Sequence, residues 1–196
     1  MFNTKDILHN IINFVKKYKL ILISMILSTV IIISGIKLFI DKKEAKIYEI
    51  CAKQLIEISQ NIVKHYQTSP NYWGLSTEVV INKKLYTNNM KATNDTLLNI
   101  LGKPIKIGAD EYGNVVMPTA KNFVIAYTDL NKKQCIEIGS QKFNKSFWLN
   151  VIKITIKNDK HTQDFLWGSK NYDLPIKRIK LKDLCQENNN NIIIHL

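Results

Sequence analysis

The chain has 196 residues, a formal net charge of +12 and only seven glycines. This length holds one domain, or one domain with an anchor segment, and excludes a large multidomain enzyme. Neither a G-x-G-x-x-G nor a G-x-x-x-x-G-K-[ST] motif occurs, which argues against a glycine-rich nucleotide-binding loop. Lysine supplies almost all of the positive charge, because Arg178 is the only arginine. Since nucleic-acid readers mostly use arginine for forked contacts, the composition argues against nucleic acid as a partner.

Residues 20–40 form an apolar segment whose only charge is Lys37, near its far end. A helix needs roughly 20 apolar residues to cross a bilayer. A buried core helix rarely stays apolar on every face for so many turns. A secretory signal has a shorter apolar run followed by an A-x-A-like site, which is missing here. We therefore predict a retained transmembrane helix over 20–40, with 1–19 as a basic cytoplasmic tail.

Residues 41–67 contain neither glycine nor proline, and their apolar positions recur at helical spacing. The segment is predicted to be an amphipathic extension of the same helix, ended by the Pro70 region. The alternative is two helices with a kink near Gly35. The predicted packing stripe consists of Ile47, Cys51, Leu55, Ile58 and Ile62.

The remaining residues, 68–196, read as short strands joined by polar loops, and are predicted to form the extracytoplasmic domain. The predicted strands include 104–107, 114–117, 122–127, 135–138, 152–156 and 191–196. Asp173 is expected to cap a short helix with Pro175 in its first turn and Ile176, Ile179 and Leu184 facing inward. The predicted fold class is α+β: a long N-terminal helix, membrane-spanning in its first half, packed on a mostly antiparallel β-sheet.

The three cysteines lie too far apart for a C-x-x-C motif, so a zinc or redox motif is unsupported. Cys51, on the helix stripe, is interpreted as a small buried residue. A bridge between Cys135, which opens a predicted strand, and Cys185 would close about 50 residues and contribute about 4 kcal/mol. Such a bridge requires an oxidising compartment, which would place the C-terminal domain outside the cytoplasm. The spacing alone leaves open whether it forms.

No enzyme motif is evident. The four histidines lack an H-E-x-x-H context, and no serine has a G-x-S-x-G elbow. Asp159, Lys160, His161 and Asp164 lie in a polar loop, where a solvated turn is favoured over acid–base or metal chemistry. We expect no catalytic, cofactor-binding or metal-binding residues, and no cofactor.

The basic run PIKRIKLK, residues 175–182, has two interpretations. It is either the solvated face of the short helix or a contact for anionic lipid headgroups or DNA. The solvated face is favoured.

Four segments in a fixed order resemble one family of surface-filament proteins. They are SPNYWGLSTEVVINKKLYTNNM (69–90), LGKPIKI (101–107), FVIAYTDLNKKQC (123–135) and CQENNNNIIIHL (185–196). Their order and spacing are similar to those of type IV pilins, in particular the type IVb group that includes PilS. The resemblance runs from about Ile50 to Leu196.

This resemblance implies a pilin-like fold and a disulfide between Cys135 and Cys185. It implies as partners the lipid bilayer and other pilin or secretion-machine subunits. It also implies a single-pass protein of the bacterial inner membrane, with a cytoplasmic N-terminus and a periplasmic domain, and a possible place in a pilus. The N-terminus departs from the family pattern, because no glycine precedes the apolar run and no acidic residue lies within 20–40.

Three hypotheses follow. The first is a membrane-anchored pilin-like (minor pilin) subunit with a structural role in a pilus or a related secretion or uptake machine. The second is a bitopic assembly component of a secretion system that is never polymerised. The third is a basic receptor domain that captures DNA.

Overall fold

The computed structural model describes residues 4–110, 121–141, 143, 151–166 and 174–196. The chain divides into two compact units, Met1–Glu44 and Ala45–Leu196. In the described part of the chain, every fully buried apolar side chain lies between Tyr48 and Leu196. The second unit therefore carries its own hydrophobic core.

Helix α1 (Thr4–His65) contains the apolar segment and the amphipathic stripe. It passes through Gly35 without a break and ends shortly before Pro70, close to the predicted end at Gln67. From Ile23 to Ile40 every side chain is exposed. By length and composition alone, the part of α1 from Ile23 to His65 contains a stretch long and apolar enough to cross a membrane.

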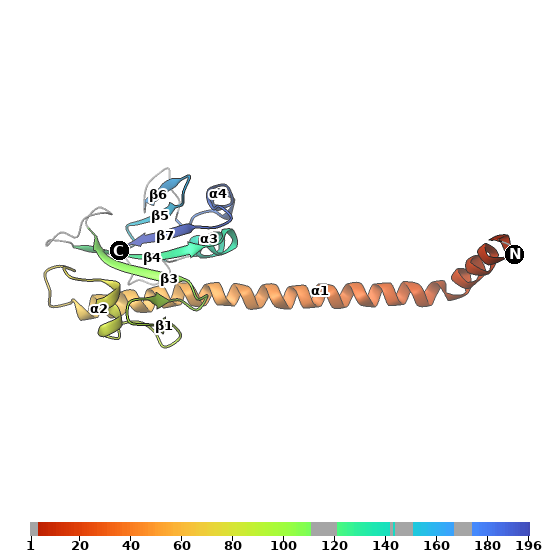
Figure 1. Cartoon of the computed structure of the whole chain (residues 1–196), viewed down its shortest axis with the longest axis horizontal. Helices are drawn as coiled ribbons and strands as arrows, with labels where there is room; N and C mark the ends of the chain where they lie inside the picture. Colours follow the sequence, from red (N-terminus) through yellow and green to blue (C-terminus); the bar gives the residue numbers. More distant parts are fainter. Residues whose placement is uncertain (1–3, 111–120, 142, 144–150, 167–173) are drawn as a thin grey trace. The chain divides into compact units, whose positions relative to one another are not determined.

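One antiparallel sheet of seven strands organises the described part of the second unit (Figure 1). The strand order is β1-β2-β3-β4-β7-β5-β6, so the C-terminal strand lies between β4 and β5. The strands are β1 (Lys91–Ala92), β2 (Leu97–Leu98), β3 (Pro104–Asp110), β4 (Asn122–Leu130), β5 (Lys153–Lys157), β6 (Thr162–Leu166) and β7 (Asn190–His195). The predicted strands 104–107, 122–127 and 191–196 fall on β3, β4 and β7.

Alternation of side chains decides which face of the sheet meets the core. In β4, Phe123, Ile125 and Tyr127 are buried, whereas the residues between them are half-buried. This pattern follows from the two-residue period of a strand. β5 departs from the expected alternation because Thr155 is buried as well as Ile154 and Ile156. The predicted strand 114–117 lies outside the described residues.

The prediction of a strand over 135–138 is wrong, because these residues belong to helix α3 (Lys132–Gly139). Asn131 caps the helix with its side chain, and Gln134 reaches back to the backbone of Asn131. This reciprocal capping box satisfies two backbone N–H groups that a helix start otherwise leaves unpaired. It therefore outweighs the strand preference of the isoleucines, which face the core from a helix instead.

The short C-terminal helix α4 (Arg178–Leu184) begins later than predicted, with Lys177 at its N-cap. Pro175 precedes the helix, and Asp173 lies outside the described residues. The expectation that Ile179 faces inward is wrong: its side chain is 71% exposed. Because the helix starts at Arg178, Leu181 takes the inward position and is fully buried. A further helix, α2 (Thr77–Asn82), is capped by the Ser76 side chain.

Candidate functional site: a buried helix stripe and a disulfide-linked helix pair

The stripe on α1 is the first candidate site. Cys51, Leu55, Ile58 and Ile62 have no exposed surface, and Ile47, at the start of the second unit, is half-buried. The four buried residues, Cys51, Leu55, Ile58 and Ile62, belong to the same apolar cluster as the buried residues of the sheet. Their three- and four-residue spacing puts them on one side of the helix. This part of α1 is thereby fixed to the sheet by apolar packing.

Polar contacts accompany that packing. The phenol Oη of Tyr127 on β4 donates to the carbonyl oxygen of Cys51 at 2.7 Å, and both groups are buried. The Gln54 amide donates to the Asn89 carbonyl and side-chain oxygens and accepts from the backbone N–H of Ile100. Because a buried polar group without a partner is costly, these bonds favour one seating of the helix.

Burial also sets the chemistry of the stripe. It raises the pKa of the Cys51 thiol to about 12. It raises the pKa of Tyr127 well above its ordinary value, with a smaller contribution from Cys51. A thiol becomes reactive as its thiolate. Cys51 therefore stays protonated in the folded chain near neutral pH, as a packing residue.

The second candidate site is the pair of helices α3 and α4. A disulfide joins Cys135, within α3, to Cys185, at the C-terminal cap of α4, and their Cα atoms lie 6.0 Å apart. Both cysteines are buried. The helices approach closely at Gly139, where an added Cβ would lie 3.2 Å from the side chain of Leu181. A side chain at position 139 would require Leu181 to shift by a few tenths of an ångström.

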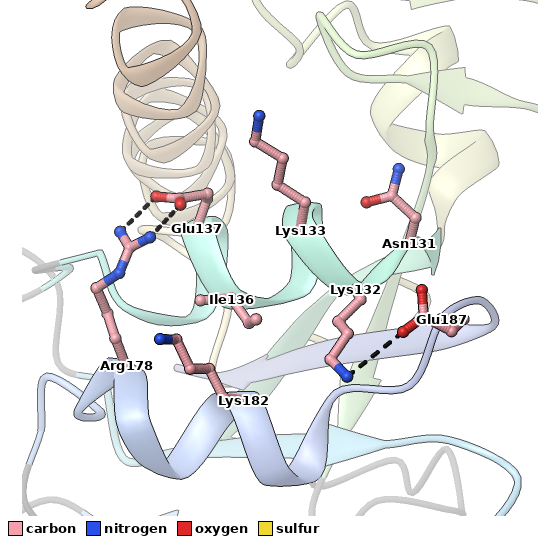
Figure 2. A pocket seen from close by; sticks show the side chains of 8 residues that line it. All are labelled: Asn131, Lys132, Lys133, Ile136, Glu137, Arg178, Lys182 and Glu187. Atoms are coloured by element: carbon pink, nitrogen blue, oxygen red, sulfur yellow. Dashed lines mark hydrogen bonds and ion pairs between the residues drawn. The ribbon is translucent and has the colours of Figure 1, made fainter. Parts of the chain in front are cut away.

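Two ion pairs lie at the ends of a cleft of about 570 Å³ between these helices (Figure 2). At one end the Arg178 guanidinium donates two hydrogen bonds to the carboxylate of Glu137. At the other, Lys132 Nζ lies 3.4 Å from Glu187 Oε1. The hydrogen bonds from Arg178 to Glu137 raise the pKa of the guanidinium, although burial opposes them. Lys182 lies between the two pairs.

The loop expected to be a solvated turn is the connection between β5 and β6. Asn158 Oδ1 accepts hydrogen bonds from the backbone N–H groups of Lys160 and His161. The side chains of Asp159, Lys160 and His161 are exposed. The turn does not bring Asp164 to them, because that residue lies on β6 and contacts Thr155 and Lys153 instead.

Asp164 belongs to a small polar cluster on the sheet. Thr155 Oγ1 donates to Asp164 Oδ1 at 2.6 Å, and Lys153 Nζ lies 3.3 Å from Asp164 Oδ2. Burial alone would raise the pKa of Asp164. The hydrogen bonds from Thr155 and Lys153, with the charges of Lys153 and His195, outweigh burial and lower it. Among the described residues, no three His, Cys, Asp or Glu side chains form a group that could hold a metal ion.

Sequence reasoning missed α2, the short strands β1 and β2, the edge strand β6 and the Arg178–Glu137 pair. For α3 a signal was present, since Asn131 and Gln134 have the spacing of a capping box. The Tyr127–Cys51 hydrogen bond had no local signal, because its partners are 76 residues apart.

The arrangement of α1 and the sheet is that of a pilin. The structure is similar to the crystal structure of TcpA, a type IV pilin from Vibrio cholerae El Tor biotype, with a TM-score of 0.52 and 12% identity. The match covers 77% of this chain and 99% of TcpA. A type IVb pilin from Salmonella typhi also matches, with a TM-score of 0.49, 14% identity, and 78% and 97% of the two chains covered. The fold defines this protein as pilin-like.

The family model described as PilS N terminal matches residues 45–196. The chain therefore belongs to the PilS family, and the resemblance to the PilS-like type IVb group is confirmed. No curated protein matches this chain. The family and the fold are structural rather than enzymatic.

Proposed function

We propose that this protein is a membrane-anchored type IV pilin-like subunit, a minor pilin, with a structural role in a pilus or a related secretion or uptake machine. The PilS family match over residues 45–196, on a pilin fold, carries the proposal. In this role the protein is not an enzyme, and its partners are other pilin or secretion-machine subunits.

The anchoring part rests on the apolar half of α1. Every side chain from Ile23 to Ile40 is exposed, and Lys37 is the only charge among them. Apolar surface of this extent requires cover by lipid or by other helices. We propose that residues 20–40 span the inner membrane, with segment 1–19 as the cytoplasmic tail. Segment 41–67 then extends the helix, and 68–196 forms the periplasmic domain.

The Cys135–Cys185 disulfide supports this topology, because disulfides persist in oxidising compartments such as the periplasm. Mass spectrometry of the protein from membranes, without reductant, tests it. We expect the mass of a chain that has lost two hydrogens. Free thiols at both Cys135 and Cys185 would argue against a periplasmic domain.

A second role is favoured by the lack of any acidic residue within 20–40, where pilins usually carry a glutamate. In that role the protein is a bitopic assembly component that is never polymerised. N-terminal sequencing of the membrane-bound protein and of filaments sheared from cells separates the two roles. A chain trimmed just before the apolar run and present in filaments supports the pilin. An intact Met1, found only in membranes, supports the assembly component.

A further inference from the structure

Helix α4 presents an apolar side chain within a row of basic ones. Arg178, Ile179, Lys180 and Lys182 are exposed, as is Lys177 at the N-cap. Ile179 is 71% exposed, more than most large apolar side chains of the second unit. We call Lys177–Lys182 the basic ridge. An isoleucine exposed to this degree is not stabilised by burial in the hydrophobic core of its own chain.

The ridge is held in this orientation. The disulfide fixes the end of α4 to α3, and Leu181 is fully buried beneath the ridge. Asn158 Nδ2 donates to the carbonyl oxygen of Leu184 at 2.8 Å. Rotation of Ile179 inward would break these contacts and expose Leu181. The ridge is therefore a preformed surface.

The charges of the ridge suit a lipid surface better than a nucleic acid. It carries four basic residues and no acidic one. Its arginine, the only one in the chain, is already engaged by both oxygens of Glu137. The remaining cations are lysines, which attract anionic headgroups as point charges. The boundary between headgroups and acyl chains accommodates an exposed isoleucine between lysines, because amphipathic surfaces bury their apolar side chains there and keep their charges at the headgroups.

The first residue of the basic ridge, Lys177, lines the same groove as residues of α1 near the start of the second unit. A groove of about 700 Å³ is lined by Glu49 and Lys53 of α1 on one side and by Pro175 and Lys177 on the other. Glu49 follows Ile40, the last residue of the predicted span, by nine residues. Nine residues reach at most about 32 Å even when fully extended. Chain connectivity thus keeps this edge within reach of the surface that residues 20–40 enter.

We propose that the basic ridge docks on an anionic lipid bilayer, with Ile179 in the boundary between headgroups and acyl chains and Lys180 and Lys182 at the headgroup phosphates. The inference rests on the membrane anchoring proposed above. Anchoring raises the effective concentration of lipid at the ridge, so that a weak contact suffices.

The test compares the full chain in nanodiscs of phosphatidylcholine alone with the same chain in nanodiscs rich in phosphatidylglycerol. Lysines are labelled briefly with an amine-reactive reagent and quantified by mass spectrometry. Anionic lipid should slow labelling of Lys180 and Lys182 by about threefold or more, and 1 M salt should remove most of that protection. The exposed lysines Lys83, Lys91 and Lys106, on other elements, are internal controls that should not change.

Substitution of Ile179 tests whether the protection of the lysines depends on this apolar side chain or on charge alone. I179S should lose most of the protection, whereas I100S, at an isoleucine that is 38% exposed, should keep it. Equal labelling in the two lipids would overturn the inference while leaving the anchoring intact. A chain that fails to enter nanodiscs would overturn both. Protection by duplex DNA that I179S does not affect, with none by lipid, would assign the ridge to nucleic acid and overturn the lipid contact.

Discussion

The phenol of Tyr127 donates a hydrogen bond of 2.7 Å to the main-chain carbonyl of Cys51, which joins strand β4 to helix α1 inside the core. Both residues are without exposed surface. The contact ties the two layers of the second unit to one register, because it has one donor and one acceptor at fixed positions. We expect this hydrogen bond to matter more for the position of the helix on the sheet than for the total free energy of unfolding.

Y127F removes this hydrogen bond and keeps the ring. We expect a loss of about 1 kcal/mol in the free energy of unfolding, because a typical net hydrogen bond contributes that much. Urea unfolding of the full chain in detergent micelles, followed by tryptophan fluorescence, measures it. Y86F, at a half-buried tyrosine, serves as the control and should stay within about 0.5 kcal/mol of the parent chain.

I58A tests whether the stripe is the packing face of α1. Ile58 is fully buried in the core cluster, so truncation should cost about 2–5 kcal/mol through lost transfer free energy and a cavity. V63A, on the same helix at a valine that is 46% exposed, should cost less than about 0.5 kcal/mol. Equal effects of the two substitutions in urea unfolding would refute the predicted stripe.

C135A/C185A removes the cross-link between α3 and α4. The closed loop spans a sequence separation of 50. Because the bridge restricts the unfolded chain, its removal should cost about 4 kcal/mol in the chain-entropy model. Thermal unfolding of the parent and the double variant, both without reductant, provides the comparison. A melting temperature unchanged by the double substitution would show that the bridge is not formed in the protein as isolated.

The three cysteines should differ in reactivity. Cys51 is buried and its thiol pKa is raised to about 12, so a thiol reagent at pH 8 should label none of the folded chain. In denaturant without reductant we expect one thiol per chain, and after reduction all three. Rapid labelling of the folded chain would contradict the burial of Cys51.

The lowered pKa of Asp164 makes the free energy of unfolding depend on pH in the acidic range. In the folded chain this pKa lies below the ordinary value of an aspartate, about 3.9, so the ionised carboxylate stabilises the fold above that pH. The contribution should fade as the pH drops below about 4, where the carboxylate of the unfolded chain protonates first. D164N should reduce the loss of unfolding free energy below about pH 4, which we call the acid limb. D159N, in the exposed turn, should leave the acid limb unchanged. An acid limb that persists in D164N would assign it to other groups.

Local patterns in the sequence predicted much of this architecture. The spacing of Cys51, Leu55, Ile58 and Ile62 predicted a helix with one buried side, and this period is set by the backbone geometry of the helix itself. Runs of β-branched residues predicted β3, β4 and β7. The apolar run over 20–40 needed only its length and composition to indicate a membrane span.

The same reasoning failed where two local signals competed. The isoleucines of 135–138 favour a strand, but the capping box of Asn131 and Gln134 starts a helix there. At α4 the helix starts only five residues after the expected cap, and this shift turns Ile179 outward and Leu181 inward. Successive residues of an α-helix differ in direction by about 100°. A helix boundary that is misplaced by a few residues therefore changes which of the following side chains are predicted to be buried.

The sequence by itself determined a long helix, apolar all round in one half and striped in the other, followed by a β-rich domain with two cysteines available for pairing. Those features depend on neighbours in the chain, which a sequence displays directly. Only the tertiary structure decided that β7 lies between β4 and β5, that Tyr127 reaches Cys51, and that Arg178 and Glu137 join α3 to α4. These contacts connect residues 34 or more positions apart, and no local pattern encodes which distant partners the packed core brings together.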